Sequence, residues 1–272
     1  MPELPEVETT RRGLEPWLLG QRIQVFIVRN PRLRWPVPED LSTRLPGHTI
    51  QHLQRRAKYL LVQTEGPGLL LHLGMSGSLR RCTLETPLRP HDHWRLFLPD
   101  DYEIRYHDPR RFGCCLPLPA VGETHPLLAA LGPEPVDNPA FSGDYLYQRS
   151  RQRQTAIKGW IMDQRVVVGV GNIYATEALF LAGIHPQRPA GQVTLSEYQA
   201  LAQAIQQVLQ RAIARGGTTL RDFVREDGQH GYFRQELQVY GRAGQSCPQC
   251  GQTIASQRIG QRASAFCPQC QR

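Results

Sequence analysis

Hydrophobic and polar residues alternate in short runs along roughly the first 115 residues of the chain. Turn residues, mainly Gly, Pro and Asp, separate these runs. A period of two places successive side chains on opposite faces of a β-strand. The pattern therefore predicts an antiparallel sandwich or barrel over residues 1–115. The predicted strands are Ile23–Val28, Thr49–Leu53, Tyr59–Gln63, Leu69–Leu73, Trp94–Leu98 and Glu103–Tyr106.

From Tyr145 onward the hydrophobic period becomes helical. The segments Ile157–Asp163 and Asn172–Ala182 predict two helices. The clearest helix follows Thr194-Leu-Ser-Glu197, because Thr and Glu at this spacing form a capping box. Its apolar stripe continues to Gly216-Gly217, which is typical of a helix end.

Two further segments, at the start and in the middle of the chain, predict a helix and a linker. Acidic residues in Glu3-Leu-Pro-Glu6-Val-Glu8, followed by Arg11 and Arg12, suit the dipole of a helix that ends at Gly13 or Gly20. The proline-rich stretch Leu116–Asn138 predicts a short helix and then a linker between domains.

Cysteine residues are concentrated at the end of the chain. Two Cys-Pro-Gln-Cys turns are separated by sixteen residues, Gly251–Phe266, which is enough for a hairpin. Two such turns supply the four thiolates that a tetrahedral Zn²⁺ prefers. Two disulfides or a redox pair are the alternatives, but the N-terminus lacks the basic and apolar pattern of a signal peptide. We therefore expect one structural zinc ion, bound by Cys247, Cys250, Cys267 and Cys270.

The remaining cysteines have no metal-ligand spacing. We expect them to behave as small buried hydrophobic residues. They are Cys82, Cys114 and Cys115.

The charge of the chain points to a polyanionic partner. Its formal net charge is +8, and thirty of its 32 basic residues are Arg. Only Lys58 and Lys158 carry an ammonium, which can exchange a proton near neutral pH when its site tunes it, whereas Arg cannot. These two lysines are candidates for proton transfer, with chance as the alternative. No apolar run approaches the roughly 18 residues of a membrane span, so we expect a soluble intracellular protein.

Several short motifs could carry chemistry. A Met1-Pro2-Glu3 start allows removal of the methionine, which leaves Pro2 with a secondary amine able to form an iminium with an aldehyde-like carbon. Glu3 and Glu6 are then within reach as acid or base, although many chains begin Met-Pro without such a role.

Two turns and one helix start could bind nucleic acid. Asp108-Pro-Arg-Arg-Phe-Gly113 could wedge Phe112 into a base stack, or could bury Phe112 in the core. Met75, on a turn flanked by glycine, has the same two interpretations. Gly169-Val-Gly171-Asn172 could bind phosphate through backbone amides, or Asn172 could simply cap a helix. The basic run that ends at Arg153 could follow a nucleic-acid backbone or be a solvated face.

Taken together, these motifs resemble bacterial formamidopyrimidine-DNA glycosylases over essentially the whole chain. Met75, Arg110 and Phe112 favour this family over the related endonuclease VIII branch. Gly159-Trp160 is a local departure from the resemblance. The motifs are Met1-Pro-Glu-Leu-Pro-Glu-Val-Glu8, Arg55-Arg-Ala-Lys58, His72-Leu-Gly-Met-Ser-Gly77, Asp108-Pro-Arg-Arg-Phe-Gly113, Val168-Gly-Val-Gly-Asn-Ile-Tyr174, Gly216-Gly-Thr-Thr219, Gln238-Val-Tyr-Gly241 and the zinc hairpin with Gln261-Arg262.

The resemblance implies an α+β multidomain protein with duplex DNA in a cleft between its domains. Residues 1–133 would form a catalytic β-sandwich with flanking helices. Residues 134–240 would form a helix–two-turn–helix DNA-binding domain with a lesion-capping loop at Thr218–Tyr232. Residues 241–272 would form a zinc β-hairpin.

The resemblance also implies a bifunctional glycosylase and lyase of base excision repair. Pro2 would attack C1′ of an oxidised purine nucleotide such as 8-oxoguanine or a formamidopyrimidine, flipped from the duplex. Glu3 would act as acid and base, and Glu6 would hold the lesion site. Lys58 would donate a proton in β-elimination, and δ-elimination would follow. The family assigns Arg262 as a second donor, but a guanidinium is a poor acid, which favours a phosphate clamp.

Other residues would bind the DNA. The resemblance assigns Met75, Arg110 and Phe112 to the gap left by the flipped base, with Arg110 on the estranged cytosine. Backbone, phosphate or lesion contacts would come from His91, Arg153, Lys158 and Asn172. We expect a monomer in the bacterial cytoplasm that binds double-stranded DNA with oxidised purines or abasic sites, without a membrane partner.

Two other functions fit parts of the sequence. One is an endonuclease VIII-like glycosylase for oxidised pyrimidines. The other is a catalytically silent DNA-binding module with a zinc hairpin, but such a module would need neither Pro2, Glu3 nor Lys58.

Overall fold

The computed structural model describes residues 1–119, 123–217 and 233–272, which form two compact units. The N-terminal unit holds the described residues up to 129 together with 215–217. The C-terminal unit holds residues 130–214 and 233–272. The predicted domain boundaries after residues 133 and 240 stay predictions.

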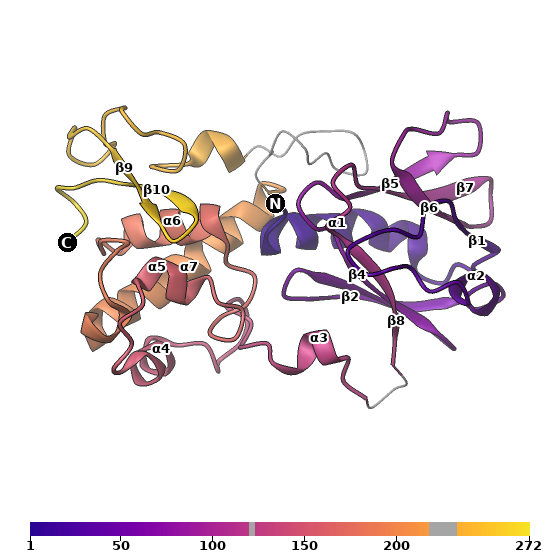
Figure 1. The fold of residues 1–272 in the computed structure, drawn as a ribbon, viewed down its shortest axis with the longest axis horizontal. Helices are drawn as coiled ribbons and strands as arrows, with labels where there is room; N and C mark the ends of the chain where they lie inside the picture. The colour runs from indigo at the N-terminus through magenta and orange to yellow at the C-terminus, as the bar shows by residue number, and fades with distance from the viewer. Residues whose placement is uncertain (120–122, 218–232) are drawn as a thin grey trace. The chain divides into compact units, whose positions relative to one another are not determined.

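The N-terminal unit is a sandwich of two four-stranded antiparallel sheets, as predicted (Figure 1). The first sheet has the order β1-β6-β7-β5, and the second has the order β2-β3-β4-β8. The strands of the first sheet are β1 (Val25–Val28), β5 (Ser78–Thr83), β6 (Asp92–Phe97) and β7 (Tyr102–His107). Those of the second are β2 (Ile50–Arg56), β3 (Tyr59–Thr64), β4 (Gly68–His72) and β8 (Cys114–Leu118).

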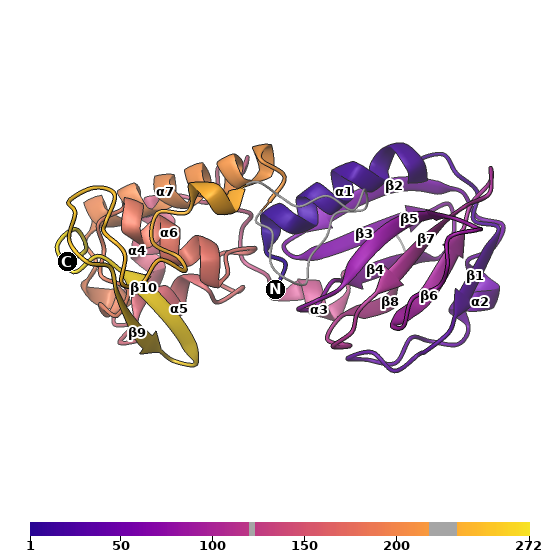
Figure 2. The same cartoon turned by 90° about the horizontal axis from the view of Figure 1, so that it is seen from above.

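One hydrophobic core fills the space between the two sheets. Helix α1 (Leu4–Leu18) runs beside β2 and β3 and adds Val7, Leu14 and Leu18 to that core (Figure 2). The helix passes through Gly13, one of its two predicted ends, because Leu14 and Leu18 remain buried beyond it. Two short helices, α2 (Leu41–Arg44) and α3 (Pro126–Ala129), complete the unit.

The sequence pattern missed two strands. Strand β5 is rich in polar residues. Leu79 faces the core, whereas Arg80 lies on the opposite face of the sheet, where it is buried in an ion pair with Asp92. Strand β8 overlaps the predicted linker and contains Pro117. A proline is tolerated there because β8 is an edge strand that pairs only with β4. The predicted short helix does follow, as α3.

The C-terminal unit is helical, with a terminal hairpin. Helix α6 is surrounded by other elements, and residues 173–180 are all buried. Helix α7 begins with the predicted capping box, since Thr194 N–H donates to Glu197 Oε2 at 2.8 Å. The helices are α4 (Gly143–Ser150), α5 (Ile157–Ile161), α6 (Asn172–Leu181) and α7 (Leu195–Ala214), with short 3₁₀ turns at Ala190–Gln192 and Phe233–Glu236.

A buried carboxylate connects α6 to the chain that enters the terminal hairpin. Glu177 is 3% exposed. It accepts hydrogen bonds from the backbone N–H groups of Gln238, Val239 and Tyr240 at 2.8, 3.0 and 2.8 Å. Burial raises the pKa of Glu177, and these three hydrogen bonds oppose the rise. These bonds use backbone amides alone, so they fix the path of residues 238–240 and not the choice of their side chains.

The terminal hairpin, β9 (Ala255–Ile259) and β10 (Arg262–Phe266), is packed against the helices of its own unit. Its small core includes Phe180 of α6. The ring of Phe266 packs edge-on against the ring of His185, with 4.5 Å between the two ring centres. The backbone N–H of His185 donates to the carbonyl of Arg272 at 2.9 Å. The hairpin is therefore fixed to the end of α6.

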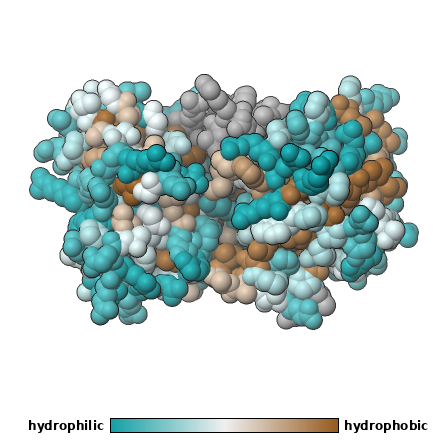
Figure 3. Space-filling model, viewed as in Figure 1, coloured by the Kyte–Doolittle hydropathy of each residue, from teal (hydrophilic) through white to brown (hydrophobic). Residues whose placement is uncertain are grey.

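Hydrophilic residues cover much of the face shown in Figure 3, and brown hydrophobic residues gather mainly over the N-terminal unit. No helix in residues 1–119, 123–217 and 233–272 is long and apolar enough to cross a membrane.

Candidate active site

The start of α1 gathers the residues predicted to carry the chemistry. Pro2 is buried, and Glu3 and Glu6 are 2% and 0% exposed. The backbone N–H of Glu3 donates to Glu6 Oε2 at 2.8 Å, so the carboxylate of Glu6 caps the helix. The positive end of the helix dipole favours carboxylates at this position. Two buried acids therefore lie beside a proline that becomes an amine once Met1 is removed.

Gly217 packs against Glu6 within the same unit. Its φ is +80°, and a Cβ there would lie 3.0 Å from Glu6 Oε1. A larger residue would thus be strained by its backbone and would crowd the carboxylate. The predicted lesion-capping loop, Thr218–Tyr232, lies outside the described residues.

Lys58 lies in the tight turn between β2 and β3 and is only 7% exposed. Ala57 precedes it at a φ of +55°, which is costly for a residue with a Cβ. Arg55 holds this turn: its Nη1 donates to the carbonyl of Ala57 at 3.1 Å, and its Nε donates to Glu8 of α1 at 3.2 Å. The Glu8–Arg55 pair therefore connects the helix that carries Glu3 to the turn that carries Lys58.

A neutral histidine lies near Lys58. Burial, with the positive charges of Lys58 and Arg34, lowers the pKa of His72 to about 4. Its Nδ1 accepts from the N–H of Gly74 at 2.9 Å, which leaves the ring proton on Nε2. His72 therefore adds no positive charge beside Lys58 at neutral pH.

The two predicted wedge turns lie at the ends of strands. Phe112 is 45% exposed, which excludes the alternative in which it fills the core. The guanidinium of Arg110 lies 5.1 Å from the centre of the Phe112 ring. Met75 lies on the turn after β4 and is partly exposed. Exposed aromatic and basic side chains on short turns can enter a base stack.

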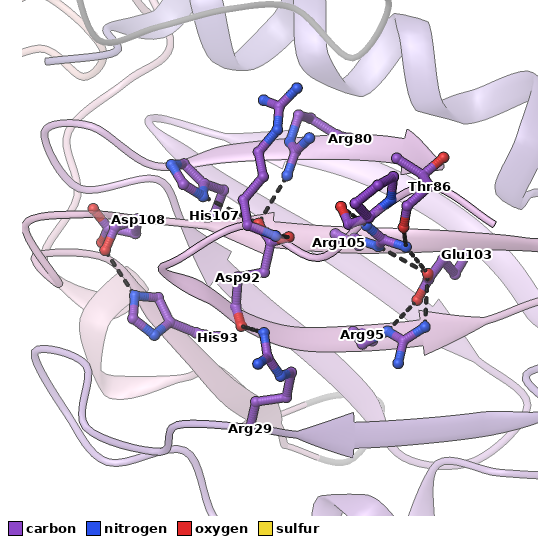
Figure 4. A network of polar contacts seen from close by, with 12 residues as sticks. Arg29, Arg80, Thr86, Asp92, His93, Arg95, Glu103, Arg105, His107 and Asp108 are labelled. Carbon is purple, nitrogen blue, oxygen red and sulfur yellow. Dashed lines mark hydrogen bonds and ion pairs between the residues drawn. The ribbon is translucent and has the colours of Figure 1, made fainter. Parts of the chain in front are cut away.

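His91 is exposed, with a φ of +70°, and leads into a buried polar network (Figure 4). Asp92 accepts from Arg80 at 2.7 Å and from His107 at 3.0 Å. Burial raises the pKa of Asp92, but hydrogen bonds from His107 and the Arg89 amide lower it to about 2. A second network joins Glu103 to the buried Arg105 and to Arg95. These networks hold the strands that carry the exposed turns.

In the C-terminal unit, Lys158 is turned inward. It is 1% exposed, and its Nζ donates to Ser264 Oγ at 2.7 Å and to the carbonyl of Ala263 at 3.3 Å. Its ammonium thus holds β10, the strand that begins with Arg262. A pocket of about 290 Å³ lies between α5 and the hairpin turn, lined by Lys158, Gly159, Met162, Asp163 and residues 259–262.

The other predicted DNA contacts of this unit differ in their surroundings. Arg153 is exposed. Asn172 begins α6, and its Oδ1 is buried without a hydrogen-bond partner among the described residues. The predicted phosphate cradle is only partly available, because the N–H of Gly169 already donates to Gln164 Oε1 at 3.0 Å.

The four terminal cysteines form a metal site. Their sulfur atoms all lie within 4.8 Å of one another. The Sγ distances are 3.9 Å for Cys247–Cys270 and 3.5 Å for Cys250–Cys267. A disulfide needs about 2.05 Å, whereas a zinc ion about 2.3 Å from each sulfur spaces them about 3.8 Å apart. The site fits zinc and excludes the predicted disulfide alternative. Cys82, Cys114 and Cys115 are buried, as predicted.

Sequence reasoning assigned no role to several residues that organise these sites. Glu8, Asp92, Asp108 and Glu177 are buried carboxylates that hold turns or chain segments through hydrogen bonds. Two of them, Glu8 and Asp108, lie within motifs quoted from the sequence, so motif membership was a signal, but their partners were not visible.

Known proteins resemble the chain over its whole length. Family models match residues 1–115 (formamidopyrimidine-DNA glycosylase N-terminal domain), 131–224 (the H2TH domain of the same enzyme) and 244–272 (zinc finger found in FPG and IleRS). A formamidopyrimidine-DNA glycosylase from Thioalkalivibrio sulfidiphilus is 58% identical over 272 residues and covers 100% of both chains.

Solved structures from Lactococcus lactis agree. Wild-type Fpg in complex with DNA containing N7-benzyl-Fapy-dG has a TM-score of 0.91 and 36% identity, covering 100% of both chains. Fpg in complex with DNA containing an abasic site has a TM-score of 0.91 and 36% identity, covering 99% of both. The predicted helix–two-turn–helix and zinc-hairpin architecture is confirmed.

Proposed function

The chain belongs to the formamidopyrimidine-DNA glycosylase family, and from this premise we propose that Pro2 is its nucleophile. The protein is a DNA glycosylase of base excision repair, and the DNA that it binds carries damaged or missing bases. The observation that carries the residue assignment is the buried start of α1, where Pro2 lies beside two carboxylates.

The first step replaces the base with the enzyme. After removal of Met1, the amine of Pro2 attacks C1′, the glycosidic bond breaks, and the base leaves with a proton. Glu3 supplies and accepts protons as the sugar ring opens to an iminium. Glu6, fixed by the Glu3 amide, holds the lesion side of the site. The substrates are oxidised purines such as 8-oxoguanine and formamidopyrimidines.

The second step breaks the strand. The iminium acidifies the C2′ proton; its loss expels the 3′ phosphate by β-elimination, and a further elimination expels the 5′ phosphate. Lys58 is the proton donor in β-elimination, since its ammonium lies in a buried turn beside a neutral His72. Arg262 clamps a phosphate, because a guanidinium is a poor acid.

The exposed turns open the duplex. Phe112 and Met75 fill the space of the flipped nucleotide, and Arg110 pairs with the orphaned cytosine. The half-exposed ring of Phe112 supports this role. His91, Arg153 and Asn172 contact the DNA backbone. Lys158 contributes by holding the strand of Arg262 through Ser264.

One zinc ion is structural and is held by the four terminal cysteines. Four thiolates leave no open position for a substrate, so the ion fixes the hairpin and does no chemistry. We also propose that the enzyme is a monomer of the bacterial cytoplasm, as its curated relatives come from bacteria.

Borohydride trapping tests the proposal. The enzyme is incubated with duplex DNA containing 8-oxoguanine, reduced, and mapped by peptide mass spectrometry. The sugar is expected on Pro2. An adduct on Lys58 or Lys158 would refute the assignment. Trapping with an oxidised pyrimidine but not with 8-oxoguanine would instead favour the endonuclease VIII-like alternative.

A further inference from the structure

Asp108 lies between the turns that carry the predicted DNA contacts of the N-terminal unit, which are Met75, His91, Arg110 and Phe112. It is 0% exposed, and every polar atom of it is used. Its N–H donates to the carbonyl of His91 at 3.1 Å, and its carbonyl accepts from Arg111 N–H at 3.2 Å. The same carbonyl accepts from His93 Nε2 at 2.7 Å (Figure 4). The backbone of Asp108 therefore joins the turn of His91 to the turn that carries Arg110.

The carboxylate of Asp108 reaches two further turns. Oδ1 accepts from Ser76 Oγ at 2.7 Å, and Oδ2 accepts from the N–H of Gly113 at 2.9 Å. Ser76 in turn accepts from the N–H of Arg110 at 3.3 Å. Ser76 follows Met75 directly, and Gly113 follows Phe112 directly. One carboxylate thus holds the residue next to each wedge side chain.

Close packing leaves these turns little freedom. A Cβ at Gly74 would collide with the backbone of Phe112 and Gly113. A Cβ at Gly113 would collide with the hydroxyl of Tyr106. That hydroxyl donates to Asp108 Oδ2 at 3.1 Å. Burial and the charge of Asp108 raise the pKa of Tyr106, so the hydroxyl keeps its proton.

We propose that Asp108, acting through Ser76, is the positioning residue that makes Met75, Arg110 and Phe112 one preformed wedge and fixes His91 beside it. This inference rests on the proposed function. Its physical basis is pre-organisation: ordering three side chains of surface turns in the act of binding costs conformational entropy, which a fixed pair of turns avoids. The carboxylate touches no reacting atom in this scheme and acts only through the turns.

Ser76→Ala is the sharpest perturbation, because it removes one hydroxyl between the two turns and little volume. Ser78→Ala is the matched control, since Ser78 is two residues away and also buried. We expect Ser76→Ala to slow single-turnover excision of 8-oxoguanine opposite cytosine about fivefold, or about 1 kcal/mol. Cleavage at a preformed abasic site should change less than twofold, because no base is flipped.

A double-mutant cycle with Phe112→Ala separates positioning from general stability. If Ser76 acts through the wedge, its loss should cost little once Phe112 is absent. The preference for cytosine over adenine opposite the lesion should also fall in Ser76→Ala. Asp108→Asn, which replaces an acceptor oxygen with a donor, should slow excision tenfold or more while thermal unfolding shows a folded protein.

Three results would overturn the inference: equal effects of Ser76→Ala and Ser78→Ala, equal losses on lesion and abasic substrates, or an undiminished Ser76 effect in the Phe112→Ala background. These differ from a failure of the proposed function. In that case the wild-type enzyme itself would not excise 8-oxoguanine, whatever stands at position 76.

Discussion

Removing the Glu177 carboxylate should destabilise the C-terminal unit far more than an ordinary surface substitution. The carboxylate accepts three backbone N–H groups of residues 238–240, at 2.8 to 3.0 Å. Glu177→Ala leaves all three amides without this acceptor. Glu177→Gln keeps one oxygen, and the Oε1 position serves two of the three amides, those of Val239 and Tyr240.

The expected cost follows from these contacts. A hydrogen bond to a charged acceptor contributes about 1.5–3 kcal/mol, and a buried amide left unpaired costs about 1–3 kcal/mol. Glu177→Gln loses one bond, to Gln238, and should cost about 2 kcal/mol. Glu177→Ala loses all three hydrogen bonds. It also removes a carboxylate whose raised pKa shows that burying its charge is costly, so a net cost of about 4 kcal/mol is expected.

Urea unfolding followed by tryptophan fluorescence measures this cost. Trp160 is the only tryptophan in residues 130–214 and 233–272. The part of the fluorescence change that Trp160→Phe abolishes therefore reports the unfolding of the C-terminal unit. With a slope near 2 kcal/mol per molar urea, Glu177→Ala should lower the midpoint by about 2 M. Asp144→Asn, an exposed acid on α4, is the control. Equal midpoints for the Gln and Ala variants would refute the reasoning, since it requires a larger loss of stability when more amides are released.

Three further predictions address the other sites. Lys58→Arg keeps the charge but cannot exchange the proton, so strand cleavage at an abasic site should fall at least tenfold, and near-wild-type rates would contradict this. Cys267→Ser should release zinc and weaken DNA binding in a titration while the sandwich stays folded; unchanged affinity without zinc would count against a hairpin role for Arg262. The pKa of Asp92 in the folded protein is about 2, below its ordinary value of 3.8. Ionised Asp92 therefore stabilises the fold fully above pH 3.8, and this stabilisation is lost as the pH falls through about 2. Asp92→Asn should remove about 2 kcal/mol of this acid-dependent stability, as measured by urea unfolding at several pH values, and an unchanged pH profile would disprove it.

Local patterns predicted much of the architecture because their causes are local. The capping box before α7 depends on residues three positions apart, and the cysteine pairs on turns of four residues. Strands with clear alternation were found for the same reason. Strand β5 was missed because its buried Arg80 is neutralised by a residue twelve positions away, which no local pattern reveals.

The organisation of the site lies in contacts between distant residues. Asp108 meets Ser76 across 32 positions, and Glu177 meets Gln238 across 61. The sequence could not show that the ammonium of Lys158 donates to Ser264, and its place among the DNA contacts stays a prediction. Likewise, the glycine-rich helix start suggests free amides, but Gln164 already occupies that of Gly169. The hydrogen-bond partner of a side chain or amide depends on which groups the fold brings near it.

The burial of both lysines has a consequence for how the molecule behaves near damaged DNA. An abasic site is an aldehyde in its open form, and any exposed, uncharged amine can condense with it. Lys58 is 7% exposed and Lys158 is 1% exposed, so the positive surface consists of guanidinium groups. These attract phosphates but remain protonated and non-nucleophilic. In the proposed mechanism the exposed basic surface therefore offers no competing amine to the aldehyde, and imine formation is left to the proposed nucleophile, Pro2.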